Sequence, residues 1–170
     1  MNWTIIIIET AALVLIFTAA IMIPLIKNPV WWIHDYPKDI QERYFETHDR
    51  IPTRFFSGKV LVKKGGAVIL SSILLALLIR PTGADSFLSA LAVSYGMWLV
   101  IDWYDCFFLD WVLFANVKTV RLPGTEDMDK AYHQKRYHVI RSLWGMLLGL
   151  IPCLLASLMY YCIFAIPDAL

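Results

Sequence analysis

The sequence lacks the motifs of the common nucleotide-dependent and hydrolytic enzymes. It contains no GxxxxGK[ST] loop, no GxGxxG fingerprint, no GxSxG elbow and no HExxH pair. These absences leave P-loop, dinucleotide-binding, serine-hydrolase and zinc-protease chemistry without support. The net charge of +1 likewise gives no support to nucleic-acid binding.

Charged residues are scarce, and cysteine occurs without metal or disulfide spacing. Asp, Glu, Lys and Arg make up 17% of the chain, against about 25% in a typical globular domain. The three cysteines, Cys106, Cys153 and Cys162, lie in apolar runs with no CxxC pair. We therefore expect them to be small buried hydrophobes. No basic residue precedes the first apolar run and no A-x-A-like site ends it, so a cleavable signal peptide is not expected.

What the sequence does contain is long apolar runs. Hydrophobic residues make up 59% of the chain, the mean hydropathy is +0.60, and seven Trp and eight Tyr suit several crossings of a water–lipid interface. A membrane crossing needs about 20 apolar residues, and four blocks of the chain reach that length. The sequence predicts an all-α integral membrane protein, a four-transmembrane-helix bundle in one membrane domain over residues 1–170. The expected spans are about 3–26, 60–79, 86–110 and 142–166.

The distribution of Lys and Arg predicts the orientation. Residues 27–64 hold eight of them, residues 80–85 hold one, and residues 118–141 hold six. Positively charged connections stay in the cytoplasm, so both termini are expected outside, with cytoplasmic loops at 27–59 and 118–141. The expected location is the plasma (inner) membrane, as a multi-pass protein.

A short helix is expected in the first of these loops. Pro37 suits the first turn of a helix. Ile40, Tyr44, His48 and Ile51 then recur at helical spacing. We expect this segment to lie along the membrane surface as an interfacial helix.

Three aspartates in the third apolar block raise the question of function. Asp102, Asp105 and Asp110 lie in a stretch that is otherwise apolar from Ser86 to Val117. At about 1.5 Å per helical residue, Asp102 and Asp105 would lie roughly 24 and 28 Å from Ser86, toward the cytoplasmic leaflet. Ionisable side chains inside a membrane usually pair with one another or line a water-filled path.

Helical spacing places these acids and two aromatic residues on one face. At about 100° per residue, Tyr95, Trp98 and Asp105 fall within about 60° of Asp102, and Asp110 lies about 80° away. We therefore predict that this face turns into the bundle, around a polar cavity that opens to the cytoplasm. The opposite face suits lipid and carries Val100, Tyr104, Phe107 and Trp111.

Two carboxylates one helical turn apart can share a proton, bind a cation or hold a metal ion. Asp102 and Asp105 are therefore the candidate catalytic pair. Aromatic rings beside them would add cation–π contacts to an organic cation. The alternative is that the acids pair with basic residues of the inward loops, such as Lys63, Lys64, Lys118 or Arg121, and only anchor the helix. The candidate ligand-binding residues are Tyr95, Trp98, Asp110 and Glu126.

The last inward loop adds polar residues on the same side. It begins with a Pro-Gly turn, Thr125 is expected to cap a helix, and acids such as Glu126 suit the positive end of that helix. All four histidines of the chain lie in inward loops, and His and Asp are common ligands of divalent transition metals. A divalent metal ion is thus a candidate cofactor, and the alternative is that these histidines are simply solvated. The candidate ligands are His34, His48, His133 and His138.

Three classes of function remain open. Transport sites lie near the bilayer midplane, whereas these acids lie lower, which favours a cytoplasm-facing site for a cation, metal or lipid headgroup. If that site is catalytic, the protein is a membrane-embedded lipid- or isoprenoid-modifying enzyme. One alternative is an oligomeric proton- or cation-coupled transporter that uses Asp102 and Asp105. Another is an accessory or assembly subunit, because the GxxxG pair Gly145 and Gly149 lets a helix approach closely. The expected partners are membrane lipids, and further copies of the chain or a larger membrane complex.

Overall fold

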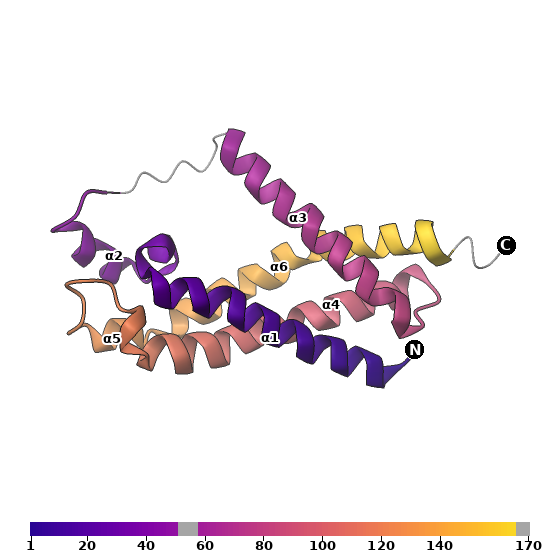
Figure 1. Cartoon of the computed structure of the whole chain (residues 1–170), viewed down its shortest axis with the longest axis horizontal. Helices are drawn as coiled ribbons and strands as arrows, with labels where there is room; N and C mark the ends of the chain where they lie inside the picture. The colour runs from indigo at the N-terminus through magenta and orange to yellow at the C-terminus, as the bar shows by residue number, and fades with distance from the viewer. Residues whose placement is uncertain (51–57, 166–170) are drawn as a thin grey trace. The chain divides into compact units, whose positions relative to one another are not determined.

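The computed structural model describes residues 1–50 and 58–165, and these residues form helices with no strand among them. Four helices are long: α1 spans Trp3–Lys27, α3 spans Gly58–Ile79, α4 spans Phe87–Tyr104 and α6 spans Lys135–Tyr160 (Figure 1). α4 continues as a π-helix, η3, over Asp105–Phe114, and α6 continues as a second one, η5, over Tyr161–Ala165. Shorter helices are η1 (Pro29–Asp35), α2 (Lys38–Phe45), η2 (Arg80–Thr82), η4 (Lys118–Val120) and α5 (Asp129–Tyr132).

Four of the described helical segments are long and apolar enough to span a membrane, which confirms the four predicted helices of membrane-spanning length. They cover Trp3–Lys27, Val60–Thr82, Phe87–Phe114 and Asp129–Phe164. The third segment has 28 residues. At about 1.5 Å per residue, a segment of that length is roughly 42 Å long, against about 30 Å of hydrocarbon. Part of it therefore extends beyond the hydrocarbon when it spans a bilayer.

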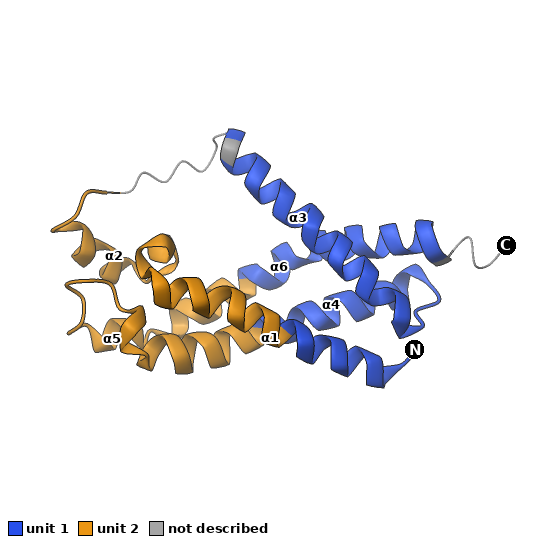
Figure 2. Cartoon of the chain, in the orientation of Figure 1, with its two compact units in different colours: residues 1–13, 53–102, 144–170 blue, residues 14–52, 103–143 orange. Residues whose placement is uncertain are grey.

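The chain divides into two compact units (Figure 2). Unit 1 contains residues 1–13, 53–102 and 144–170, and unit 2 contains residues 14–52 and 103–143. α1, α6 and the continuous helix of α4 and η3 each contribute residues to both units. Nothing in the sequence pattern indicated this division.

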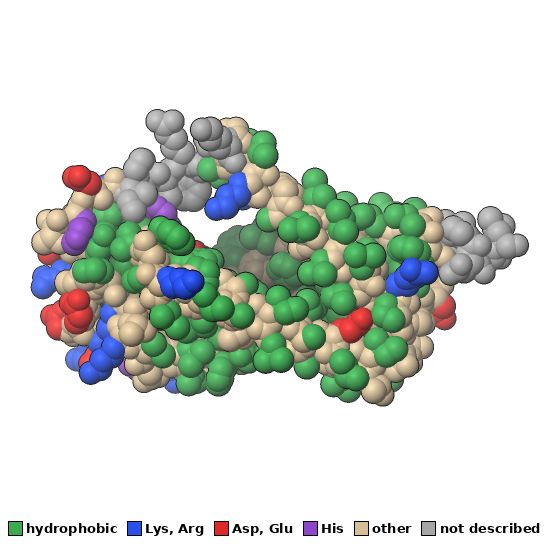
Figure 3. Space-filling model, in the orientation of Figure 1, with side chains coloured by type: hydrophobic (Ala, Val, Ile, Leu, Met, Phe, Trp, Pro, Cys, Tyr) green, Lys and Arg blue, Asp and Glu red, His purple; other side chains and the backbone are tan. Residues whose placement is uncertain are grey.

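Unit 1 has a core of small and apolar side chains, with a few buried hydroxyl groups. Ser94 and Ser157 are both buried, and their Oγ atoms lie 3.3 Å apart. The Tyr160 hydroxyl donates to the Ala84 carbonyl at 2.6 Å. Large apolar side chains are exposed on the outer faces of α1, α3 and α6, as expected where lipid rather than water covers the surface (Figure 3). Examples are Ile7, Ile8, Val62, Leu70, Leu147 and Leu148.

The cysteine prediction holds for two of the three residues. Cys106 and Cys153 are buried, whereas Cys162 is exposed. Cys162 lies in the π-helix η5 near the end of the described chain. The prediction that it is buried is therefore wrong, because an apolar run inside a membrane also supplies the side chains that face lipid.

Unit 2 is a folded body built largely from the two connections that the sequence predicted as loops. Its core contains residues from both, including Ile33, Tyr36, Val120, Leu122 and Tyr132, each at most 1% exposed. Charged and histidine side chains gather on its surface around α2 and α5 (Figure 3). The connections thus have an apolar core of their own and a polar exterior.

α2 lies where a short helix was predicted, directly after Pro37. Ile40 and Tyr44 are buried in the core of unit 2, and Phe45 packs against this core. The residues that suggested a lipid-facing stripe therefore pack against protein. The placement of this helix at a membrane surface stays a prediction, and Ile51 lies outside the described residues.

The Pro-Gly turn forms as predicted, but Thr125 has a different role. Gly124 has a φ of +79°, and the Thr125 amide donates to the Leu122 carbonyl at 3.1 Å, as in a turn with Pro before Gly. Thr125 is fully buried and bonds to Leu122 and Tyr132 instead of capping a helix. α5 begins after Met128, which makes no side-chain cap. The expected N-cap is therefore wrong, because tertiary hydrogen bonds use the hydroxyl.

α6 begins at Lys135, seven residues before the predicted span at residue 142. Its first two turns carry the basic residues that marked this segment as a loop in the sequence. Lys135 and Arg136 are exposed, whereas His138 and Ser142 are buried. A helix with one buried face does not need an apolar composition, so the composition alone set the predicted boundary too late.

Candidate functional site

Three of the predicted site residues lie on the face of α4 that packs against α6 within unit 1. The Trp98 indole Nε1 donates to the Gly145 carbonyl at 3.1 Å, and the Tyr95 hydroxyl donates to the Met146 carbonyl at 3.3 Å. The Asp102 carboxylate lies next to Gly145, where a Cβ atom would overlap it. The acidic and aromatic face of this helix is therefore turned toward another helix, and the glycine pair lets the two approach closely, as the spacing indicated.

Asp105 and Asp110 lie in unit 2, in the π-helix η3, whereas Asp102 belongs to unit 1. A π-helix bonds residue i to i+5, so it turns less per residue than an α-helix. The angular positions predicted beyond Tyr104 at about 100° per residue therefore do not apply. The described structure does not join Asp102 and Asp105 in one compact unit, and their role as a catalytic pair stays a prediction.

The predicted lipid face is correct only in part. Val100 and Phe107 are exposed, at 51% and 48%. Tyr104 instead packs against the core of unit 2, and its hydroxyl accepts a hydrogen bond from Thr18 at 3.1 Å. Trp111 is half-buried, with Lys135 Nζ 4.9 Å from its ring centroid. Tyr104 and Trp111 are therefore only partly exposed, unlike Val100 and Phe107.

The structure brings Asp110 and His138 together inside unit 2. Asp110 Oδ2 lies 2.8 Å from His138 Nδ1. The His138 side chain is only 5% exposed, and that of Asp110 is 26% exposed. The rings of Phe114 and Tyr137 lie beside the imidazole, with centroids at 5.5 and 5.3 Å. The Asp110 carboxylate is thus partly exposed to solvent, whereas its partner His138 is buried among aromatic rings.

The other ring nitrogen of His138 defines what this pair can do. Nε2 is buried and has no hydrogen-bond partner among the described residues. A carboxylate accepts, so Nδ1 carries the proton and the Nε2 of a neutral ring presents a lone pair. An oriented imidazole of this kind can accept a hydrogen bond, take up a proton or ligate a metal ion.

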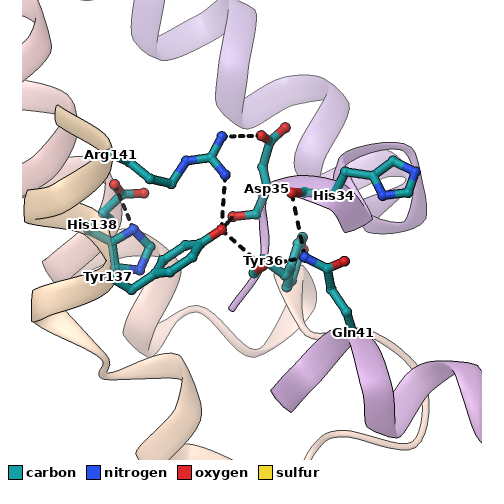
Figure 4. Close-up of polar contacts among 8 residues, drawn as sticks. His34, Asp35, Tyr36, Gln41, Tyr137, His138 and Arg141 are labelled. Atoms are coloured by element: carbon teal, nitrogen blue, oxygen red, sulfur yellow. Dashed lines mark hydrogen bonds and ion pairs between the residues drawn. The ribbon is translucent and has the colours of Figure 1, made fainter. Parts of the chain in front are cut away.

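A second polar cluster joins the start of α6 to the first connection (Figure 4). Arg141 forms an ion pair with Asp35, and its other terminal nitrogen donates to the Tyr137 hydroxyl at 2.9 Å. That hydroxyl donates toward the carbonyls of Asp35 and Tyr36, at 3.1 and 3.0 Å. Gln41 donates to the Tyr36 carbonyl at 2.7 Å. This cluster fixes the backbone of residues 35–36 against the first turns of α6.

Tyr36 anchors the same connection from the inside. Its hydroxyl donates to the Val120 carbonyl at 2.5 Å, and its ring packs edge-on to Phe114 and Tyr132. Burial, with smaller contributions from Tyr132 and Asp35, raises the pKa of Tyr36 well above its usual range. The phenol therefore stays protonated and keeps its donor role at all physiological pH values.

The remaining predicted residues lie elsewhere in unit 2. His48 stacks on Tyr44 at 4.1 Å, and the Nδ1 of His133 lies 2.8 Å from the Asp129 carbonyl. His34 lies in η1, where its own carbonyl accepts from Gln41. Glu126 is exposed and accepts from the Gly124 amide at 3.1 Å, so it closes a turn. In the described part of the chain, no three His, Cys, Asp or Glu residues come together as a metal-binding group.

Sequence reasoning missed Asp35, Tyr137 and Arg141. Their contacts join residues that lie about a hundred positions apart, and no local pattern indicates such a pairing. One signal was present: Tyr137 and Arg141 are four residues apart and His138 and Arg141 three apart, so on a helix they are neighbours. The assumption that residues 118–141 form a loop concealed it.

Comparison with known proteins identifies no relative from which a function could be inferred. No family model, no curated protein and no solved structure matches the chain.

Proposed function

We propose that this multi-pass membrane protein binds anionic phospholipid headgroups through the basic first turns of α6. The observation that carries the proposal is the exposure of Lys135, Arg136 and Arg141 immediately before the exposed apolar residues Leu143 and Trp144. Cationic side chains at the start of a membrane-spanning helix lie at the depth of the headgroup phosphates. The partial exposure of Arg141, at 47%, leaves part of its guanidinium open to such a ligand.

The proposed orientation puts the connections 27–59 and 118–141 in the cytoplasm and both termini outside, in the plasma (inner) membrane. The density of Lys and Arg in residues 27–64 and 118–141 supports it. The proposal concerns binding, and it assigns turnover to neither the aspartates nor the histidines.

The headgroup site is tested by a charge-matched pair of triple variants. Lys135→Gln/Arg136→Gln/Arg141→Gln is expected to weaken binding of phosphatidylglycerol at least about tenfold, since each cation near the surface contributes about 1 kcal/mol. The control, Lys38→Gln/Arg43→Gln/Lys130→Gln, removes the same charge from exposed positions of α2 and α5. Native mass spectrometry of the detergent-purified protein, titrated with phosphatidylglycerol or phosphatidylcholine, measures the affinities. Equal losses in both variants, or equal affinity of the unmodified protein for both lipids, would contradict the proposal.

The orientation is tested by labelling single cysteines in sealed cells. In a variant without the three native cysteines, Asp85→Cys should react with a membrane-impermeant maleimide, and Asp127→Cys should react only after lysis. Both side chains are exposed, so the position relative to the membrane decides the reaction. Labelling of position 127 in intact cells would place the connection 118–141 outside and contradict the proposed orientation.

A further inference from the structure

His138 has a buried nitrogen whose partner the described residues do not supply. More than nine-tenths of buried polar groups in proteins have a hydrogen-bond partner, and leaving one unpaired costs about 1–3 kcal/mol. Nε2 of His138 is such an atom, in a side chain that is 5% exposed. Because Asp110 holds Nδ1 at 2.8 Å, the ring cannot turn to satisfy Nε2 without losing that contact.

The chemistry of the pair indicates what the missing partner is. In the neutral ring that donates from Nδ1 to Asp110, Nε2 presents a lone pair. The partner that satisfies this lone pair is a hydrogen-bond donor. A metal ion would need further ligands, and the described residues offer no group of three His, Cys, Asp or Glu.

Two cationic neighbours of His138 on α6 indicate that the ligand also carries a negative charge. Lys135 and Arg141 lie three residues before and after His138, so each is its neighbour on the helix surface. Both carry a positive charge beside a site that needs a donor. A phosphate ester that also carries a free hydroxyl supplies both groups: its phosphate meets the cations and its hydroxyl reaches Nε2.

We propose that Nε2 of His138 accepts a hydrogen bond from a free hydroxyl of a bound phosphate ester, and that Asp110 holds the imidazole in the required tautomer. This inference rests on the proposed headgroup site and names its ligand class, a polyol phosphate headgroup. His138 is the binding residue and Asp110 is a positioning residue.

The contacts of Arg141 link the cations that would bind the phosphate to the histidine that would bind the hydroxyl. Nε2 lies below the surface, so a hydroxyl reaches it only when a covering side chain moves. Tyr137 lies next to His138, and Arg141 holds its hydroxyl at 2.9 Å. A phosphate on Arg141 competes with Tyr137 and Asp35 for the guanidinium, which removes one of the contacts that hold the ring beside the histidine.

The test compares two lipids of equal charge, phosphatidylglycerol and phosphatidylmethanol, of which only the first has hydroxyl groups. The unmodified protein is expected to prefer phosphatidylglycerol about 3- to 10-fold, the range of one net hydrogen bond. Equal affinity for the two lipids would overturn the inference. If both bind no better than phosphatidylcholine, the proposed headgroup site itself fails, so the two failures are distinguishable.

Two variants test whether the preference for phosphatidylglycerol depends on His138 and Asp110. His138→Phe, which keeps an aromatic ring beside Phe114, should bind both anionic lipids equally. Asp110→Asn should weaken the preference without abolishing it, because the amide can donate to Nδ1 and move the ring proton to Nε2, which can then only donate to the hydroxyl oxygen. A preference that survives His138→Phe would overturn the inference.

The 15N chemical shifts of the His138 ring report on the proposed hydrogen bond directly. A soluble phosphate ester then shows whether the ligand is a lipid headgroup or a free ester. With [15N]histidine the chain has only four labelled residues, and His138→Phe assigns the resonances of His138. Phosphatidylglycerol should shift the Nε2 resonance and phosphatidylmethanol should leave it unchanged; no shift with phosphatidylglycerol would overturn the inference. If sn-glycerol 3-phosphate produces the same shift, the ester comes from solution; if only the lipid does, it is a headgroup.

Discussion

Replacing Gly149 with alanine is expected to destabilise the packing of α4 against α6 by about 2–4 kcal/mol, the sum of an overpacked contact and a lost hydrogen bond. A Cβ atom at this position would overlap three atoms of the Trp98 indole, Nε1 among them. The same nitrogen donates to the Gly145 carbonyl at 3.1 Å. The indole cannot move away from Gly149 without losing this bond.

Gly145→Ala should cost less than Gly149→Ala, although both glycines belong to one GxxxG pair. A Cβ at Gly145 would overlap one oxygen of the Asp102 carboxylate, at the end of a short side chain. The indole of Trp98 is large and rigid by comparison. The order of the two effects therefore depends on which side chain each glycine faces.

Gly96→Ala in α4 is the matched control. A Cβ there meets nothing within 4 Å, and alanine has a higher helix propensity than glycine. Thermal unfolding in detergent, followed by circular dichroism, should show Gly149→Ala well below the unmodified protein and Gly96→Ala at or above it. In a Trp98→Ala background the cost of Gly149→Ala should shrink, because the overlapping ring is gone. An unchanged melting temperature for Gly149→Ala would show that the indole does not occupy this position.

The four crossings could be predicted because length and apolar composition are properties of one segment at a time. The face shared by Tyr95, Trp98 and Asp102 was also predictable, since α4 keeps regular α-helical geometry as far as Tyr104. The same rule does not apply beyond that point. η3 turns less per residue than an α-helix, so a pattern that assumes a constant rotation does not fix the angular position of Asp110.

Unit 2 could not be predicted from local pattern, because its contacts join distant parts of the chain. The Tyr36 hydroxyl meets Val120, 84 positions later, and Arg141 meets Asp35, 106 positions earlier. Polar connections between apolar spans usually indicate solvated loops, and composition does not show that two of them share a core. Asp110 and His138 were both candidates from the sequence, but in different sets, one of ligand-binding residues and one of metal ligands. Their contact could not be predicted, because His138 was placed in a loop.

Tyr132→Phe is expected to destabilise unit 2 by about 1–3 kcal/mol, the cost of leaving a buried polar group unpaired. The Tyr132 hydroxyl accepts from the Leu122 amide at 2.9 Å and lies 2.7 Å from Thr125 Oγ1. Thr125 Oγ1 in turn donates to the Leu122 carbonyl at 2.7 Å. Phenylalanine fills nearly the same space, so the change removes the hydrogen bonds and leaves the ring packing in place.

The three groups form a closed ring of hydrogen bonds, which makes the effect of Tyr132→Phe larger than that of an ordinary surface tyrosine. Each hydroxyl donates once and accepts once, and such chains strengthen their members in a buried site. Without the phenol oxygen, the Leu122 amide has no acceptor at a position from which water is excluded. Leu122 and Thr125 are fully buried, so solvent does not replace the lost bond.

The prediction is measured by thermal or chemical unfolding in detergent, with Tyr161→Phe as the control. Tyr161 is 37% exposed, and its change to phenylalanine should stay within about 0.5 kcal/mol. Thr125→Val, which removes the second member of the ring, completes a double-mutant cycle with Tyr132→Phe. Because each single change already breaks the ring, the double variant should lose less than the sum of the two, with a coupling of about 0.5–3 kcal/mol. Strictly additive losses would mean that Tyr132 and Thr125 act independently and that the ring does not close.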